Sequence, residues 1–183
     1  MSGRDLAWAL DNADVVVGQD ELETSVVRMA DAIRADYDEA PVFLTIMHGG
    51  LPFAARLAME LGARGLDLTF DYLHATRYRG ETRGSDLVWK HRPATSLAGR
   101  RVLLVDDILD EGHTLAEIIQ WCRSEGAGDV RVAVLAVKRH DRCVPGIRAD
   151  YVGVEVPDRY VFGYGMDFHE QGRNLPAIYA LKD

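Results

Sequence analysis

The stretch VLLVDDILDEGHT, residues 102–114, decides the fold and carries most of the recognisable chemistry in the chain. Its apolar first part predicts a buried strand, and the glycine and threonine near its end predict a turn into a helix. In α/β proteins, ligands bind beyond the carboxyl ends of the parallel strands. Because Asp106, Asp107 and Asp110 follow the apolar run, we expect a binding site at this end of the strand.

Segments on both sides of this stretch alternate between strand and helix patterns. Helical spacing runs through residues 22–37, 53–62 (with Gly62 closing the helix) and 115–122. Apolar runs predict strands at residues 42–46, 101–105, 130–137 and 151–156, with a shorter strand at 160–162. Strands that alternate with helices form a mainly parallel sheet covered on both faces, so we predict one α/β domain over residues 1–183.

A strand and a long polar loop are predicted between residues 66 and 86. Alternation over residues 66–74 gives a strand with an apolar face, made by Leu66, Leu68, Phe70 and Tyr72, and a wetter opposite face. The following TRYRGETRGS, residues 76–85, has neither periodicity and predicts a mobile loop. Residues 87–89 could return from it as the second arm of a hairpin.

The composition is that of a soluble globular protein. Hydrophobic residues make up 48% and charged residues 27% of the chain, which excludes disorder as a description of the whole. The formal net charge is −8, from 21 Lys and Arg against 29 Asp and Glu. This charge does not favour nucleic acid or an anionic membrane as a partner, so we expect any anionic ligand to be held locally.

Cysteine usage and the absence of apolar runs favour the cytoplasm. Cys122 falls in a helical pattern and Cys143 in a loop, and their spacing predicts neither a zinc site nor a disulfide. Residues 1–14 lack the basic flank and apolar run of a secretory signal. No apolar run approaches the roughly 20 residues that a membrane-spanning helix needs.

The residue types between Asp106 and Thr114 fit a ribose 5-phosphate. Backbone N–H groups at a helix start, together with the Thr114 hydroxyl, form a phosphate-binding turn. The adjacent carboxylates Asp106 and Asp107 suit a vicinal diol or a metal ion. The alternative is a solvated acidic loop before a capped helix, which is disfavoured because acids, glycine and threonine all follow one apolar strand directly.

Residues 102–114 also resemble the diphosphate-sugar signature of the type I phosphoribosyltransferases: four apolar residues, two acids, two apolar residues, an acid, a variable residue, glycine, a variable residue and threonine. Within that fold, the chain is similar to the hypoxanthine-guanine phosphoribosyltransferase family. Segments in the same order match its pyrophosphate loop (His48, Gly49, Gly50), closing loop (Arg77, Tyr78), base-recognition lysine (Lys138) and C-terminal block (residues 158–167, followed by Arg173).

The resemblance spans residues 40–180 and implies a type I phosphoribosyltransferase fold: a mainly parallel twisted sheet flanked by helices, with a small hood formed by terminal segments. It implies an enzyme of purine salvage that transfers the 5-phosphoribosyl group of 5-phosphoribosyl 1-diphosphate to N9 of hypoxanthine or guanine. The products would be IMP or GMP and pyrophosphate, and Mg²⁺ would be the cofactor. Relatives of this type are commonly dimers or tetramers, so a homodimer or homotetramer is implied.

The same resemblance assigns roles to individual residues. Asp110 would take the purine N7 proton as N9 attacks the anomeric carbon. Lys138 would donate to the 6-oxo group, Tyr160 would stack on the purine, and the Val161 backbone would contact its exocyclic edge. The remaining assignments are ribose hydroxyls or Mg²⁺ at Asp106 and Asp107, Mg²⁺ at Asp167, the leaving group at Arg173, and the 5-phosphate at Asp110, Glu111, Gly112, His113 and Thr114.

Three departures from the family pattern qualify these roles. His48 stands where the pyrophosphate loop usually carries Lys or Arg, so pyrophosphate affinity would be weaker or pH-dependent. Glu111 brings a carboxylate into the phosphate loop, where its charge must point away or be offset, with His113 as a candidate partner. The closing loop is rich in arginine (Arg77, Arg79, Arg83), which would bring compensating cations over the phosphates or merely keep the loop soluble.

Two rival functions stay in view. The same fold hosts regulators that bind nucleotides and RNA, and the net charge of −8 argues against such a role while leaving room for a local basic patch. Within the enzyme class, the rival is a preference for xanthine.

Overall fold

A six-stranded sheet with the order β4-β3-β2-β5-β6-β7 forms the centre of the molecule in the computed structural model, which describes residues 5–77 and 87–182. Every neighbouring pair is parallel except β3 and β4, which are antiparallel. The strands are β2 (Val42–Ile46), β3 (Thr69–Arg77), β4 (Leu87–His91), β5 (Arg101–Leu109), β6 (Asp129–Lys138) and β7 (Tyr151–Val156). The mainly parallel sheet and the hairpin return after residue 86 are therefore confirmed.

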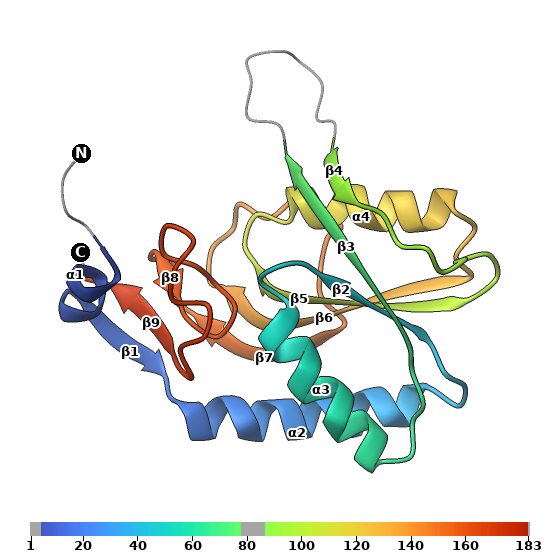
Figure 1. The fold of residues 1–183 in the computed structure, drawn as a ribbon, viewed down its shortest axis with the longest axis horizontal. Coiled ribbons are helices and arrows are strands. Elements are labelled where there is room, and N and C mark those ends of the chain that lie inside the picture. Colours follow the sequence, from blue (N-terminus) through green and yellow to red (C-terminus); the bar gives the residue numbers. More distant parts are fainter. Residues whose placement is uncertain (1–4, 78–86, 183) are drawn as a thin grey trace.

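Helices cover both faces of this sheet (Figure 1). The helices α2 (Gln19–Asp36) and α3 (Leu51–Ala63) lie on one side, and α4 (His113–Ser124) lies on the other. The helical stripe of α2 is buried as its spacing predicts, through Leu22, Val26, Met29 and Ile33. Within the described residues, no helix combines the length and apolar character needed to cross a membrane.

The ends of three elements differ from the prediction. Strand β5 does not stop at Val105 but continues to Leu109, because β6 is long enough to pair with it as far as Leu109 and Val137. Asp106 and Asp107 are therefore strand residues. Thr76 and Arg77 belong to β3 rather than to the loop, and α3 runs past Gly62 to Ala63.

The exposed face of β3 is the opposite of the predicted one. Phe70 is 64% exposed and Tyr72 also faces solvent, whereas Leu73 is fully buried and Ala75 nearly so. Leu73 and Ala75 join the core beneath α4. On the other side α3 packs mainly over β5 and β2, so the aromatic residues of β3 lie beyond its edge. The alternation therefore separates the two faces of β3 correctly, but the face predicted to be covered is the exposed one.

The terminal segments form the predicted hood as a second, antiparallel sheet with the order β1-β9-β8. Its elements are β1 (Ala13–Val17), β8 (Val161–Phe162) and β9 (Ile178–Leu181), joined by the helix α1 (Leu6–Asp11). Ala9, Phe162 and Phe168 make a small separate core there. Arg159 ties the hood together by donating to the carbonyl of Leu181 at 2.7 Å and pairing with Asp14 at 2.9 Å. The elements α1, β1 and β9 were not predicted from the sequence.

The burial of β3 predicts a contrast between two substitutions. Leu73→Ala should lower the free energy of unfolding by about 2–5 kcal/mol, because a fully buried leucine leaves a cavity. Phe70→Ala should change it by about 0.5 kcal/mol or less, as at most exposed positions. Urea unfolding of both variants measures the difference, and a larger loss for Phe70→Ala would show that the predicted face is buried in solution.

Candidate active site

The pyrophosphate-type loop and the C-terminal block pack directly against the end of β5. Gly49 and Gly50 are buried, and a Cβ on Gly49 would collide with the carboxylate of Asp107. A Cβ on Gly50 would lie 2.8 Å from the carbonyl oxygen of Val105. Gly165 has φ +108°, and a Cβ on this residue would collide with the carbonyl oxygen of Gly49. Glycine is needed at these positions because three backbones meet with no room for side chains.

Asp106 and Asp107 form an acidic pair at this junction, in which Asp107 is buried and Asp106 is partly buried. Burial raises the pKa of Asp106 well above its usual value, and the neighbouring Asp107 charge raises it further. Burial also raises the pKa of Asp107, although hydrogen bonds and the nearby Arg173 partly oppose this. The Asp107 carboxylate accepts the backbone N–H of Ile108 at 2.8 Å. Two carboxylates held in this way favour a cation or a set of hydroxyl donors beside them.

A cavity of about 730 Å³ lies between the end of β3 and the start of α4. The predicted phosphate loop lines it, together with Ala75, Thr76 and Asp106. Gly112 adopts a left-handed conformation at φ +78°, and no side chain caps the first turn of α4. The uncapped N–H groups of a helix start attract anions, so this turn suits a phosphate. The loop residues in the lining are Asp110, Glu111, Gly112, His113 and Thr114.

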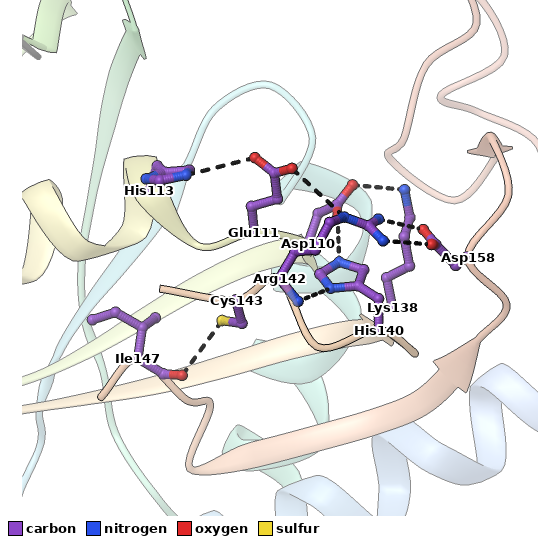
Figure 2. Close-up of polar contacts among 9 residues, drawn as sticks. All are labelled: Asp110, Glu111, His113, Lys138, His140, Arg142, Cys143, Ile147 and Asp158. Atoms are coloured by element: carbon purple, nitrogen blue, oxygen red, sulfur yellow. Dashed lines mark hydrogen bonds and ion pairs between the residues drawn. The ribbon is translucent and has the colours of Figure 1, made fainter. Parts of the chain in front are cut away.

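The carboxylate of Glu111 has a histidine and an arginine as neighbours. Its Oε2 lies 3.6 Å from His113 Nε2, the partner expected from the sequence, and its Oε1 lies 3.9 Å from Arg142 Nε (Figure 2). Arg142 also forms a bidentate pair with Asp158, at 2.8 Å for each contact. Arg142 therefore bridges the phosphate loop and the start of the C-terminal block.

Asp110 accepts hydrogen bonds from two side chains at the end of β6 (Figure 2). Lys138 Nζ lies 2.6 Å from Asp110 Oδ2, and His140 Nε2 lies 2.6 Å from Asp110 Oδ1. Burial by itself raises the pKa of Asp110, but the hydrogen bonds from Lys138 and His140 outweigh it and hold the pKa below its usual value. The structure thus joins two residues that the sequence placed separately, the predicted base and the predicted base-recognition lysine.

Asp167 and Arg173 pair with each other at 2.8 Å, and Arg173 donates to the carbonyl of Gly165 at 2.7 Å. Tyr160 is half exposed, with its hydroxyl donating to the carbonyl of Asp167 at 3.1 Å. The exposed ring is open to a stacking partner. Val161 is buried in β8 and pairs with β9.

His48 is exposed on the loop after β2, and its peptide bond with Met47 is cis. Its ring meets that of His74 edge to face, with 4.5 Å between the centroids. Burial, and then the charge of His48, lowers the pKa of His74. Arg77 is the last residue of β3, whereas Tyr78, Arg79 and Arg83 lie outside the described residues, as does the rest of the predicted mobile loop.

Comparison with known proteins accounts for this arrangement. Residues 18–169 match the family model described as "Phosphoribosyl transferase domain". The hypoxanthine-guanine phosphoribosyltransferase of Bacillus subtilis is 33% identical over 170 residues, which cover 92% of each chain. The chain belongs to the hypoxanthine-guanine phosphoribosyltransferase family. The hypoxanthine-guanine-xanthine phosphoribosyltransferase of Tritrichomonas foetus is 30% identical, over 92% of this chain and 91% of its own.

Solved structures agree with the family assignment. A hypoxanthine phosphoribosyltransferase from Staphylococcus aureus superposes with a TM-score of 0.87 and 26% identity, over 98% of this chain and 97% of that one. The type I phosphoribosyltransferase fold expected from residues 102–114 is therefore confirmed.

The acidic pair of this phosphoribosyltransferase fits a magnesium ion. Mg²⁺ is usually held by one or two carboxylates together with waters and substrate phosphates. Burial disfavours the ionisation of both Asp106 and Asp107, and the charge of Asp107 adds to this at Asp106, so a cation beside them would relieve both effects. Asp167, the third predicted ligand, is engaged by Arg173 and by the backbone N–H of Glu170.

Sequence reasoning did not single out His140, Arg142 and His74, which the structure brings into contact with predicted site residues. A usable signal was present for the first two, because Lys138-Arg139-His140-Asp141-Arg142 follows a strand at the edge where ligands bind. His74 had no such signal, since it lies within a strand and meets His48 only through the pairing of β2 with β3.

The acidic pair predicts a pH-dependent gain in stability for Asp106→Asn. A carboxyl whose pKa is raised by folding contributes stability below its usual pKa of 3.8, and that contribution is lost as the pH rises through the folded value. In metal-free buffer, Asp106→Asn should therefore raise the thermal midpoint at neutral pH, with the gain shrinking as the pH falls toward 3.8. Thermal unfolding across this range measures it.

Asp38→Asn is the matched control, because Asp38 is an exposed carboxylate outside the site. Its thermal midpoint should follow that of the wild type at every pH. A drop in stability for Asp106→Asn at neutral pH would contradict the account of the acidic pair.

Proposed function

We propose that this chain transfers the 5-phosphoribosyl group from 5-phosphoribosyl 1-diphosphate to N9 of hypoxanthine or guanine. N9 forms a bond to the anomeric carbon, the bond from that carbon to the pyrophosphate oxygen breaks, and IMP or GMP and pyrophosphate result. The proposal rests on the position of Asp110. This residue lines a phosphate-type cavity, and its Oδ2 accepts a hydrogen bond from Lys138 Nζ at 2.6 Å. A proton acceptor and a donor suited to a 6-oxopurine, both beside the proposed phosphate loop, support the proposal.

Different residues of the site bind different groups of the sugar substrate. The 5-phosphate binds the backbone N–H groups at the start of α4 and the Thr114 hydroxyl, where the helix dipole favours an anion. Asp106 lines the cavity and receives the ribose hydroxyls. The pyrophosphate binds the loop of His48, Gly49 and Gly50, with Arg173 neutralising the leaving group.

Mg²⁺ is the proposed cofactor, with Asp106, Asp107 and Asp167 as its protein ligands. When bound, it neutralises charge on the departing pyrophosphate. The chain itself holds the acceptor for the N7 proton on Asp110, which stays ionised because its pKa is lowered in the folded protein. The approach of the closing loop, including Arg77 and Tyr78, would exclude water that would otherwise hydrolyse the sugar.

Base choice rests on donors. The Lys138 ammonium has three N–H donors and uses one on Asp110, so others are available for the 6-oxo group of hypoxanthine or guanine. Adenine carries an amino group at that position, which would leave donor facing donor. Tyr160 supplies a half-exposed ring for stacking, and the Val161 backbone reads the exocyclic edge.

Xanthine is a second candidate base, favoured by one observation. The Tritrichomonas foetus relative, 30% identical, carries xanthine in its name beside hypoxanthine and guanine. Xanthine has the same 6-oxo group, so the contact with Lys138 does not distinguish it.

We also propose that the enzyme acts in the cytoplasm as a homodimer or homotetramer.

A spectrophotometric assay of nucleotide formation tests this function. Purified enzyme is given 5-phosphoribosyl 1-diphosphate and hypoxanthine, guanine, xanthine or adenine, with Mg²⁺ and with chelator. Turnover of hypoxanthine and guanine that depends on Mg²⁺ is expected. Turnover of none of the 6-oxopurines would overturn the proposal, and release of pyrophosphate without nucleotide would replace transfer with hydrolysis.

Asp110→Asn should leave the affinity for 5-phosphoribosyl 1-diphosphate within about threefold and lower kcat by about 10²–10⁴-fold, the usual contribution of a general base. The amide still occupies the loop but does not accept the N7 proton. Titration calorimetry gives the affinity and the assay above gives kcat. An unchanged kcat with hypoxanthine would remove Asp110 from the chemical step.

Lys138→Ala should narrow the preference for hypoxanthine over adenine. A site that hydrogen-bonds one specific polar atom discriminates by about 10⁴–10⁵-fold, and this discrimination disappears with the ammonium. Because Lys138 also holds Asp110, activity with both bases falls, and the ratio of the two kcat/KM values isolates recognition. Arg139→Ala, which removes the exposed neighbouring cation, is the control and should keep the wild-type ratio. An unchanged ratio in Lys138→Ala would defeat the assignment.

A further inference from the structure

The carboxylate of Asp110 is held at both oxygens by different side chains. Lys138 Nζ contacts Oδ2 and His140 Nε2 contacts Oδ1, each at 2.6 Å. A carboxylate held at one oxygen can turn about its terminal bond, whereas two donors on separate oxygens fix its plane. The orientation of Asp110 relative to the cavity therefore depends on His140 as well as on Lys138.

The hydrogen bonds of His140 define which nitrogen faces Asp110 as a donor. The backbone N–H of Arg142 donates to His140 Nδ1 at 3.0 Å, so Nδ1 is an acceptor. The proton of a neutral ring then lies on Nε2 and points to Asp110 Oδ1. His140 thus contributes a donor without adding a second positive charge beside Lys138.

The imidazole ring of His140 is held in place by the protein around it. The His140 side chain is 3% exposed, whereas Asp110 is 43% exposed, so the histidine supports the carboxylate from the protein side. The turn that carries it is anchored to the phosphate loop, because the backbone N–H of Val144 donates to the carbonyl of Glu111 at 2.8 Å. Arg142 pairs with Asp158 on the outside of the turn (Figure 2).

We infer that His140 is a positioning residue for the transfer reaction, whose Nε2–H holds Asp110 Oδ1 so that the carboxylate presents a free lone pair to the purine N7 proton. The inference rests on the proposed function. It also leaves the other N–H donors of Lys138 available to the purine, because the carboxylate of Asp110 does not depend on the ammonium alone for its orientation. His140 itself touches neither the sugar nor the purine in this scheme.

Two substitutions separate the donor from the bulk of the ring. His140→Leu removes the donor and keeps an apolar side chain of similar size, whereas His140→Gln places an amide N–H near the position of Nε2. We expect His140→Leu to lower kcat for hypoxanthine by about 10²-fold, the effect of misplacing a catalytic group by about 1 Å, with KM for 5-phosphoribosyl 1-diphosphate within about twofold. His140→Gln should recover about tenfold or more of that loss.

A double-variant cycle tests whether His140 acts through Asp110. In an Asp110→Asn background, the side chain at position 110 does not accept the N7 proton whatever its orientation. Adding His140→Leu to that background should therefore lower kcat by less than about twofold. Arg139→Ala is the matched control: it removes an exposed cation next to His140, outside the site, so its kcat should stay within about threefold of the wild type.

Equal losses in His140→Leu and His140→Gln that persist in the Asp110→Asn background would overturn the inference, as would an unchanged kcat in His140→Leu. A loss in Arg139→Ala as large as that in His140→Leu would assign the effect to the turn instead. Imidazole ¹⁵N shifts of the wild-type protein add a readout independent of turnover: a proton on Nε2 alone supports the inference, and a proton on Nδ1 overturns it. The wild-type purine assay separately decides the proposed function.

Discussion

The placement of two adjacent carboxylates near the end of β5, with Asp107 buried and Asp106 partly buried, is the constraint on which the site depends. Asp106 pairs with Val134 of β6, and Asp107 follows it within the same strand, so the sheet itself fixes their positions. Their charges are costly where they lie, and the surrounding backbones come close enough that Gly49 and Gly165 have no room for a Cβ. The site is therefore assembled around a charge that a bound cation or sugar would stabilise.

The remaining groups divide between rigid and connecting segments. The phosphate-type turn belongs to the start of α4 and Lys138 to the end of β6, so both are positioned by regular structure. Asp110 lies in the turn between β5 and α4 and gains its orientation from side chains that follow β6. The neighbouring parallel strands β5 and β6 thus bring an acid and its two donors together across 28 and 30 positions of sequence.

The hood and the central sheet are linked through the C-terminal block. Arg159 binds β9 and Asp14, while the next residue, Tyr160, offers its ring to solvent and donates to the carbonyl of Asp167. Asp158, just before them, pairs with Arg142 beside the phosphate loop. The segment proposed to hold the purine is therefore anchored on both sides by arginine, to the hood and to the turn after β6.

The sequence by itself determined the α/β class, the buried stripe of α2 and the family, because the first two follow from local periodicity and the family from the motif at residues 102–114 and the order of short motifs along the chain. Only the tertiary structure decided that β3 exposes Phe70, because coverage of a strand face depends on where α3 packs. It also decided that Asp110 binds Lys138 and His140, since contacts between residues far apart in sequence arise from the order of strands in the sheet, which periodicity does not encode.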